Sequence, residues 1–262
     1  MKGKVSSIIQ NGIATVIFFH PQSNSLPGEI LRKLAEEIFL AGNNPKVKVI
    51  ILKSEGDKTF CAGASFDELI GIKNFEEGKK FFADFALMIN AIRKVPKFVI
   101  ARVQGKTVGG GVGLAAAADY TLAVQDASIR LSELALQIGP FMIGPAVERK
   151  IGNSAFAALT INPIEWKTAN WAREKGLYAD IFPSVTELDN AINSLAEKLT
   201  RSNMETMTQL KKMLWKGTEN WDTILAEQAE ISGRLVLSEF THQYIKKFKA
   251  TNERAYSKCN FL

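Results

Sequence analysis

Hydrophobic residues at the start of the chain follow first the period of a strand and then that of a helix. Residues 5–9 and 13–19 are strand-like and flank Asn11-Gly12, a pair that favours a tight hairpin turn. Apolar residues from 30 to 38 then recur at helical spacing. The chain is therefore predicted to open with two antiparallel strands followed by a helix.

The alternation continues through the first half of the sequence. Further elements are predicted as strands over 47–52, 98–103 and 120–124, and as helices over 76–93 and 114–118. A glycine run, residues 109–113, directly precedes the last of these helices. Strands that alternate with helices in this way predict an α/β core with buried strands.

From about residue 144 onward the pattern becomes mostly helical. Residues 188–199 carry one amphipathic stripe, and residues 224–249 are predicted to form a single long helix that ends in Lys246, Lys247 and Lys249. No internal repeat or low-complexity linker divides the chain. We therefore predict a core over residues 1–200 and a C-terminal helical region over 201–262.

Composition narrows the class of protein. The chain has 262 residues, of which 46% are hydrophobic and 23% charged, and its net charge is +6 with a pI near 9.2. These values are typical of a folded globular protein. The basic residues are scattered and are not interleaved with aromatic residues as in a nucleic-acid-binding surface, so a small polyanionic ligand suits the charge better.

The sequence also favours a cytoplasmic, soluble protein. Only Cys61 and Cys259 are cysteines, and residues 1–7 are polar instead of forming a secretory leader. The apolar run over 108–118 is far shorter than the roughly 20 residues that cross a bilayer. We expect no membrane span and no membrane partner.

The glycine run at residues 109–113 is the most unusual local feature. It has neither the G-x-G-x-x-G spacing of a dinucleotide site nor the G-x-x-x-x-G-K-[ST] spacing of a phosphate loop. Glycines of this kind can serve turns and close packing alone. A glycine turn that opens a helix also presents unpaired N–H groups at the positive end of the helix dipole, which suits an anion or a developing oxyanion.

A second loop, residues 59–65, has small side chains that would let a ligand approach the backbone closely. Taken with the glycine run, it carries a family resemblance. The segment from Phe60 to Ala64, followed by residues 67–69, resembles the F-x-A-G-A-D-x-x-E-L motif of the crotonase (enoyl-CoA hydratase/isomerase) superfamily. Residues 96–111 are similar to that family's K-P-x-I-A-A-V-x-G-x-x-x-G-G-G signature, and the resemblance extends over residues 5–180.

The resemblance implies a spiral of ββα units followed by a helical trimerisation region, assembled as a homotrimer or a dimer of trimers. It implies that the backbone N–H groups of Ala64 and Gly110 form an oxyanion hole for the thioester carbonyl of an acyl-CoA. The substrate would be bound by a further set of residues: Ala62, Ser65, Phe66, Asp67, Gly109, Gly113 and Phe141. Coenzyme A would enter as part of the substrate, with no separate cofactor and no metal. Arg93, Lys94, Lys97 and the basic C-terminal helix are candidates for its phosphates.

The acid–base residues depart from the family's two-glutamate pattern. Glu133 occupies the place of the second glutamate, whereas Gly113 stands at the first. Glu133 is therefore the predicted general acid or base. Asp67 and Glu68 could replace the missing group, although a charge pair at a helix start, favoured by the dipole, is the plainer interpretation. The loop around Phe141 also differs from the family's glycine-rich run, and its bulk is predicted to narrow the pocket.

Three chemical outcomes stay open. A single glutamate could activate water in an enoyl-CoA hydratase, it could move a proton between carbons in a double-bond isomerase, or a carboxylate on the substrate could assist, as a methylglutaconyl-type substrate from leucine breakdown would allow. The resemblance thus favours an enoyl-CoA hydratase, a lyase, in the degradation of fatty acids or branched-chain amino acids, with a double-bond isomerase as the second candidate. A non-catalytic acyl-CoA-binding paralogue is the alternative from another class.

Other chemistries are disfavoured. His20 and His242 are the only histidines, too few for a metal cluster, and neither lies in a nucleophile-like sequence motif beside a serine. Cys61 has no evident basic partner, and a small packing residue is the plainer interpretation. A hydrolase triad is therefore not expected.

Overall fold

The computed structural model describes residues 3–245, and their strands form two sheets. The larger sheet has the order β1-β2-β3-β5-β7-β10. Its strands are β1 (Lys4–Gln10), β2 (Ile13–Phe19), β3 (Val49–Ser54), β5 (Phe98–Val103), β7 (Tyr120–Val124) and β10 (Asp180–Phe182). β1 and β2 pair antiparallel and all later neighbours pair parallel. The predicted hairpin is confirmed, and both turn residues, Asn11 and Gly12, have positive φ angles.

The smaller sheet has the order β4-β6-β8-β9. Its strands are β4 (Thr59–Cys61), β6 (Lys106–Val108), β8 (Ser128–Arg130) and β9 (Lys167–Thr168). The chain visits the two sheets in turn, because β3, β5 and β7 of the larger sheet are each followed by a strand of the smaller one and then by a helix. This is the predicted spiral of ββα units.

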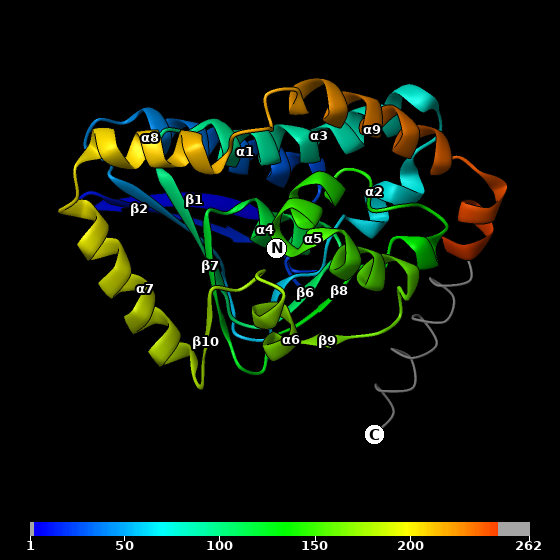
Figure 1. The fold of residues 1–262 in the computed structure, drawn as a ribbon. Coiled ribbons are helices and arrows are strands. Elements are labelled where there is room, and N and C mark those ends of the chain that lie inside the picture. The colour runs from blue at the N-terminus through cyan, green and yellow to red at the C-terminus, as the bar shows by residue number, and fades with distance from the viewer. Residues whose placement is uncertain (1–2, 246–262) are drawn as a thin grey trace.

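The helices lie around these sheets. They are α1 (Gly28–Asn43), α2 (Phe66–Gly71), α3 (Phe75–Lys94), α4 (Gly110–Ala117), the 3-10 turn η1 (Leu134–Leu136), α5 (Gly144–Ile161), α6 (Ala169–Glu174), α7 (Val185–Thr200), α8 (Met204–Leu214) and α9 (Trp221–Leu235). Figure 1 shows α1, α3, α8 and α9 grouped along one side of the molecule, with α7 running apart from them against the larger sheet. Over residues 3–245, no helix combines the length and the apolar character that a bilayer crossing needs.

Burial explains the long apolar runs in the strands. Five of the six residues of β3 are buried, as are five of the six in β5, because helices cover the sheet on both sides. The α4 helix is buried over all of its eight residues, which is why it is built from glycine, alanine, valine and leucine alone. Small side chains let this helix pass through the middle of the core, between the two sheets and α5.

The single long helix predicted over 224–249 is wrong in its described part. Helix α9 begins at Trp221 and ends at Leu235. The Thr241 hydroxyl donates a hydrogen bond of 2.9 Å to the carbonyl of Leu235 and lies 3.2 Å from the carbonyl of Gln137, so the chain turns back at this point. The Thr241 hydroxyl group thus donates to the carbonyl of Leu235, which would have accepted a backbone N–H if the helix had continued. Residues 246–249 lie outside the described part of the chain.

Candidate active site

A cavity of about 640 Å³ lies where the loop after β4, the start of α4 and the segment after β8 meet. Its wall is mostly apolar and includes two phenylalanines of α3. The lining residues are Gln22, Ser25, Ala62, Gly63, Ala64, Phe66, Asp67, Leu69, Phe82, Phe85, Val108, Gly109, Gly110, Arg130, Ser132, Glu133, Ala135, Leu136, Ile138, Gly139, Pro140, Met142, Ile143, Pro163, Ile164 and Tyr244. An apolar cavity with a few polar groups is the usual form of a small-molecule site.

The backbone N–H of Ala64 is one of the two predicted oxyanion donors. Ala64 forms an isolated parallel bridge with Leu26, in which the N–H of Leu26 donates to Gly63 and the N–H of Ser65 donates to Leu26. In extended backbone, successive N–H groups point to opposite sides. The Ala64 N–H therefore points away from Leu26 and is left without a backbone partner among residues 3–245.

Gly109 and Gly110 supply the second donor. Gly109 precedes α4 with φ 51° and ψ −118°, a left-handed conformation that glycine adopts without strain. Gly110 is the first residue of the helix, so its N–H has no partner within the helix. A Cβ atom on Gly110 would lie 2.4 Å from the ring of Phe85, so this position has room only for glycine.

The two donor loops lie against each other. A Cβ atom on Gly63 would be 2.9 Å from the carbonyl oxygen of Val108 and 3.5 Å from the nitrogen of Gly110. Gly63 has a φ of 89°, a further conformation that favours glycine. Glycine at position 63 is thus what allows the neighbouring Ala64 to approach the start of α4. The arrangement can present two N–H groups to one oxygen atom beside the positive end of a helix.

The carboxyl group of Glu133 lies against Gly109, the residue that precedes α4. A Cβ atom on Gly109 would come within 2.7 Å of Oε1 of Glu133, so the carboxyl group rests directly against the glycine that precedes the helix. Its other oxygen, Oε2, is sealed from solvent and has no hydrogen-bond partner among the described residues. Burial raises the pKa of Glu133 from 4.5 to about 7, against the opposing effects of nearby backbone N–H groups and Arg130. Such a carboxyl group can both take and give a proton near neutral pH.

The space beside Gly113, which the side chain of the family's first glutamate would need, is occupied by another residue. A Cβ atom on Gly113 would lie 2.3 Å from Cγ2 of Ile143, the residue that precedes α5. Ile143 itself lines the cavity. Gly113 is therefore buried beneath an isoleucine, and no longer side chain fits at this position unless the isoleucine moves.

The remaining predicted substrate-binding residues divide into two groups. Ala62, Phe66, Asp67 and Gly109 line the cavity, as do the predicted catalytic positions. Ser65 is buried and caps α2 by accepting a hydrogen bond from the N–H of Glu68. Phe141 lies instead in a second hollow between α5 and the start of α9, so the side chain does not narrow the main cavity as predicted.

Asp67 and Glu68 do not occupy the missing carboxylate's place. The side chain of Gln22 donates to Asp67 at 2.6 Å, and the N–H of Gly28 donates to Glu68 at 2.8 Å. Both acids lie in the first turn of α2, where the helix dipole favours negative charge. Their contacts tie α2 to the segment that precedes α1.

The basic residues proposed for the CoA phosphates have other partners in the structure. Lys97 is buried and donates to the carbonyl of Val47 at 2.6 Å. Arg93 and Lys94 both pair with Asp222 at the start of α9. The three therefore join the helices and the sheet and do not line the cavity. The basic residues at 246–249 lie outside the described part of the chain.

Cys61 and His20 were disfavoured as chemical groups. Burial raises the pKa of the Cys61 thiol to about 12, and its side chain packs against Gly111 of α4. His20 does have a serine neighbour, which sequence reasoning missed, because Ser25 Oγ lies 2.8 Å from its Nδ1. Ser25 lines the cavity, and burial lowers the pKa of His20. Over residues 3–245, His, Cys, Asp and Glu side chains form no group of three or more that could hold a metal ion.

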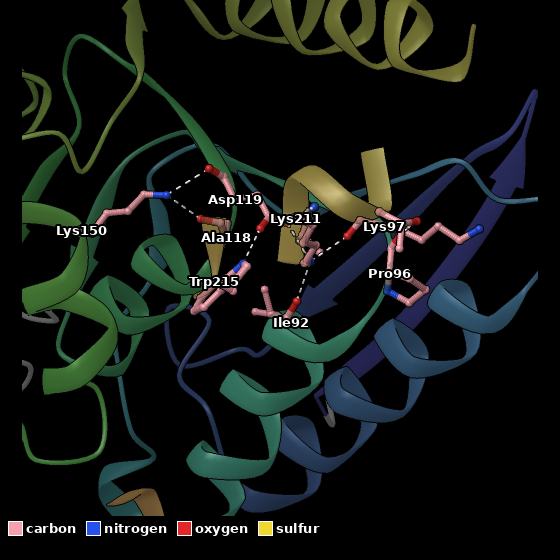
Figure 2. A network of polar contacts seen from close by, with 10 residues as sticks. Ile92, Pro96, Lys97, Ala118, Asp119, Lys150, Lys211 and Trp215 are labelled. Atoms are coloured by element: carbon pink, nitrogen blue, oxygen red, sulfur yellow. Dashed lines mark hydrogen bonds and ion pairs between the residues drawn. The ribbon is translucent and has the colours of Figure 1, made fainter. Parts of the chain in front are cut away.

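A buried polar network holds the other end of α4 (Figure 2). Asp119 follows the helix and accepts hydrogen bonds from Lys211 at 2.8 Å and from the indole of Trp215 at 2.7 Å. Lys150 of α5 donates to the carbonyls of Ala118 and Asp119. A cation at a helix C-terminus is favoured by the dipole. The network therefore anchors the helix whose opposite end carries Gly110.

Arg130 and Tyr244 are among the polar residues of the cavity that were not predicted to be functional. Arg130 is the last residue of β8, and Tyr244 comes from the segment after α9. Arg130 stands three residues before Glu133 in the sequence, which was the signal available for it. Tyr244 carried no signal, because only the tertiary fold brings the C-terminal segment to the cavity.

Comparison with known proteins agrees with this geometry. The family model described as enoyl-CoA hydratase/isomerase matches residues 8–255. A probable enoyl-CoA hydratase of Bacillus subtilis is 26% identical over 245 residues, which cover 93% of this chain and 95% of that protein. A peroxisomal Delta(3,5)-Delta(2,4)-dienoyl-CoA isomerase of Arabidopsis thaliana is 28% identical over 211 residues, or 75% of this chain and 74% of that protein.

The fold is shared as well. The crystal structure of an enoyl-CoA hydratase from Bacillus halodurans superposes with a TM-score of 0.86 at 21% identity, covering 93% of this chain and 99% of that chain. The match of the family model spans both sheets, the glycine turn and Glu133. The chain belongs to the enoyl-CoA hydratase/isomerase family.

Proposed function

We propose that this chain is an enoyl-CoA hydratase in which the N–H groups of Ala64 and Gly110 hold the thioester oxygen and Glu133 moves the proton. The observation that carries the proposal is the position of the Glu133 carboxyl group, which rests against the glycine that precedes α4 and has one oxygen, Oε2, sealed from solvent. An acyl chain whose carbonyl oxygen reached Gly110 would have its reacting carbons beside this carboxyl group.

The proposed reaction needs one carboxyl group only. The ionised Glu133 takes a proton from water while the water oxygen bonds to C3, and the electron pair of the double bond moves toward the thioester oxygen. The resulting enolate is stabilised by the two N–H donors, each worth roughly 2.7 to 4 kcal/mol. The proton then passes from Glu133 to C2. The net change is the addition of one water molecule across the double bond.

A double-bond isomerase is the second candidate. It is favoured by the contact between Gly113 and Ile143, which leaves no room for a carboxylate at position 113. A two-glutamate hydration would need a carboxylate there. A single base suffices for isomerisation, since Glu133 could take a proton from C2 of a 3-enoyl-CoA and return it to C4. The two N–H donors would stabilise the same enolate. The relatives include both a hydratase and an isomerase.

The test compares purified protein with a 2-enoyl-CoA and with a 3-enoyl-CoA. Loss of the conjugated thioester absorbance from the first supports hydration, and its gain from the second supports isomerisation. Glu133→Gln should lower turnover by roughly 10² to 10⁴-fold, since it removes the proton carrier. Glu227→Gln, at an exposed glutamate of α9, is the matched control and should change nothing.

A non-catalytic acyl-CoA-binding protein is separated by solvent exchange. A saturated acyl-CoA in D₂O should exchange its C2 protons when Glu133 is present and should stop doing so in Glu133→Gln. Exchange in neither protein, together with no turnover, would leave binding as the only function. Full turnover by Glu133→Gln would show that another group moves the proton.

Three further properties belong to the same proposal. Coenzyme A enters as part of the substrate and no separate cofactor or metal takes part. The protein acts in the cytoplasm. It assembles as a homotrimer or a dimer of trimers, which light scattering of the purified protein would show.

A further inference from the structure

Arg130 is a charged side chain of the cavity that the proposed reaction does not use. It ends β8, and its carbonyl accepts a 2.9 Å hydrogen bond from the N–H of Gly109. Arg130 lines the same cavity as Glu133, and its charge is close enough to interact with that carboxyl group. The backbone of Arg130 and the carboxyl group of Glu133 thus both lie against Gly109, the glycine that precedes α4.

The guanidinium group has no anionic partner in the described structure. It forms neither an ion pair nor a hydrogen bond with any residue of 3–245, and its Nε is sealed from solvent without a partner. The guanidinium group stacks on the indole of Trp166, whose ring centre lies 4.5 Å from Cζ. Stacking on an indole orients a guanidinium and favours its charge, but it uses none of the five N–H donors.

The Arg130 side chain is partly buried and its Nε is sealed from solvent, so leaving its donors without an acceptor is costly, and the site lacks an anion at this point. Burial lowers the pKa of Arg130, while the nearby Glu133 only partly opposes this effect. Glu133 cannot serve as a fixed counter-ion, because it must become neutral whenever it carries the proton. The anion that completes the site has to arrive with the ligand.

We infer that the substrate is an enoyl-CoA whose acyl part carries a carboxylate, and that Arg130 binds this carboxylate. The inference rests on the proposed function and adds the class of acyl group. A guanidinium fork matches a carboxylate with two parallel hydrogen bonds, which gives orientation as well as affinity. Tyr244, on the same wall, offers a hydroxyl group as a further donor.

The phosphates of coenzyme A are the other source of negative charge. The pantetheine arm separates them from the thioester, whereas Arg130 lies beside the proton carrier that acts on C2 and C3. The charge near Arg130 therefore belongs to the acyl part. The two sources differ in one measurable respect, because the phosphates are common to all acyl-CoA ligands and the carboxylate is not.

The experiment uses two matched pairs of ligands. Glutaconyl-CoA and 2-pentenoyl-CoA have acyl chains of equal length and differ in a terminal carboxylate, and they serve as substrates. Glutaryl-CoA and pentanoyl-CoA are their saturated counterparts, which report binding without turnover. The wild-type protein should favour the carboxylate member of each pair by roughly ten- to a hundredfold, the range expected of a charge-assisted hydrogen-bonded pair.

Variants at position 130 assign the preference. Arg130→Gln should remove it, and Arg130→Lys should keep part of it, because a lysine retains the charge without the fork. Lys106→Gln is the matched control, since Lys106 faces the same Trp166 ring at 5.6 Å but is exposed and does not line the cavity. Thermal unfolding of each variant establishes that it is folded.

The outcomes separate the inference from the proposed function. Equal or better use of the uncharged ligands by the wild-type protein overturns the inference while hydration stands. An equal loss with both members of a pair in Arg130→Gln also overturns it, because Arg130 would then bind a part common to both. Absence of turnover with every substrate overturns the hydratase, and the saturated pair still decides the role of Arg130.

Discussion

Asp119 and Glu133 are two buried carboxylates at opposite ends of the α4 region, and their surroundings differ completely. The side chain of Asp119 is 3% exposed, and both of its oxygens accept hydrogen bonds, from Lys211, Trp215 and the N–H of Val99. One oxygen of Glu133 is sealed without any partner among the described residues. Both oxygens of Asp119 are thus paired within the fold, whereas Oε2 of Glu133 is not.

The difference separates a carboxylate that holds the fold from one that can do chemistry. A carboxylate with every lone pair directed at a donor is stabilised as an anion and fixed in place. For Glu133, burial outweighs the effects of the nearby backbone N–H groups and of Arg130, and it raises the pKa to about 7. Both residues are acidic, so the hydrogen-bond partners and surroundings of each carboxyl group are what distinguish them.

The largest expected effect comes from removing Lys211, the cation that pairs with Asp119. Lys211 uses all three of its donors, toward Asp119 and the carbonyls of Ile92 and Lys97. Lys211→Met should lower the free energy of unfolding by about 3 to 5 kcal/mol, because it leaves Asp119 buried without its counter-ion. Lys212→Met, at the exposed neighbour, is the control. Chemical denaturation measures both, and similar small losses would show that the network is not structural.

Replacing Glu133 should instead increase the stability of the protein at high pH. The pKa of Glu133 is about 7 in the folded protein and 4.5 when unperturbed, so its ionisation opposes folding. This cost is absent below about pH 4.5, grows as the pH rises, and is complete above about pH 7, where it reaches roughly 3 kcal/mol. Glu133→Gln should therefore stabilise the protein at pH 8 and much less at pH 5. An equal effect at both pH values in denaturation experiments would contradict the raised pKa.

The same pKa sets the pH dependence of the activity. Both proposed reactions begin with the ionised form of Glu133, which is a minor species below about pH 7. The value of kcat/KM should therefore rise about tenfold per pH unit up to that point and level off above it, giving about a hundredfold difference between pH 5 and pH 8. Initial rates over this range measure the profile. A flat profile would mean that Glu133 is not the base.

Local pattern was enough to predict most of the fold. The turn residues Asn11 and Gly12 and the period-two strands on either side determine the hairpin, and the predicted strand over 98–103 matches β5 residue for residue. These features depend on neighbours in the sequence. The end of α9 depends instead on Thr241, which reaches back to Leu235 and across to Gln137, and no local pattern contains that contact.

The residues of the candidate site were predictable where a family motif contains them. The positions of Ala64, Gly110 and Glu133 follow from the resemblance, and the structure brings all three to one cavity. Phe141 was expected there because of its place in a loop, but the backbone directs it to another hollow. Tyr244 and the stacking of Trp166 on Arg130 join residues far apart in the chain, so their proximity could be known only from the fold.

The smallest expected effect concerns the reason why Glu133 has no acidic partner. A methyl group at Gly113 would meet Cγ2 and Cβ of Ile143 at 2.3 and 2.6 Å, so Gly113→Ala should cost about 1 to 3 kcal/mol of stability through overpacking. Gly71→Ala, where nothing lies within 4 Å of the new atom, is the control and should be neutral or slightly stabilising.

A double-mutant cycle tests whether Ile143 causes the stability cost of Gly113→Ala. Its second variant is Ile143→Gly, which removes both of the contacting atoms. If the contact with Ile143 is what excludes a side chain at position 113, Gly113→Ala should cost less in the Ile143→Gly background, with a coupling of about 0.5 to 3 kcal/mol. Additive losses would mean that some other neighbour excludes it. A positive coupling would establish that one isoleucine, placed by the start of α5, closes the position of the family's first glutamate at Gly113 and leaves the proposed proton transfer to Glu133.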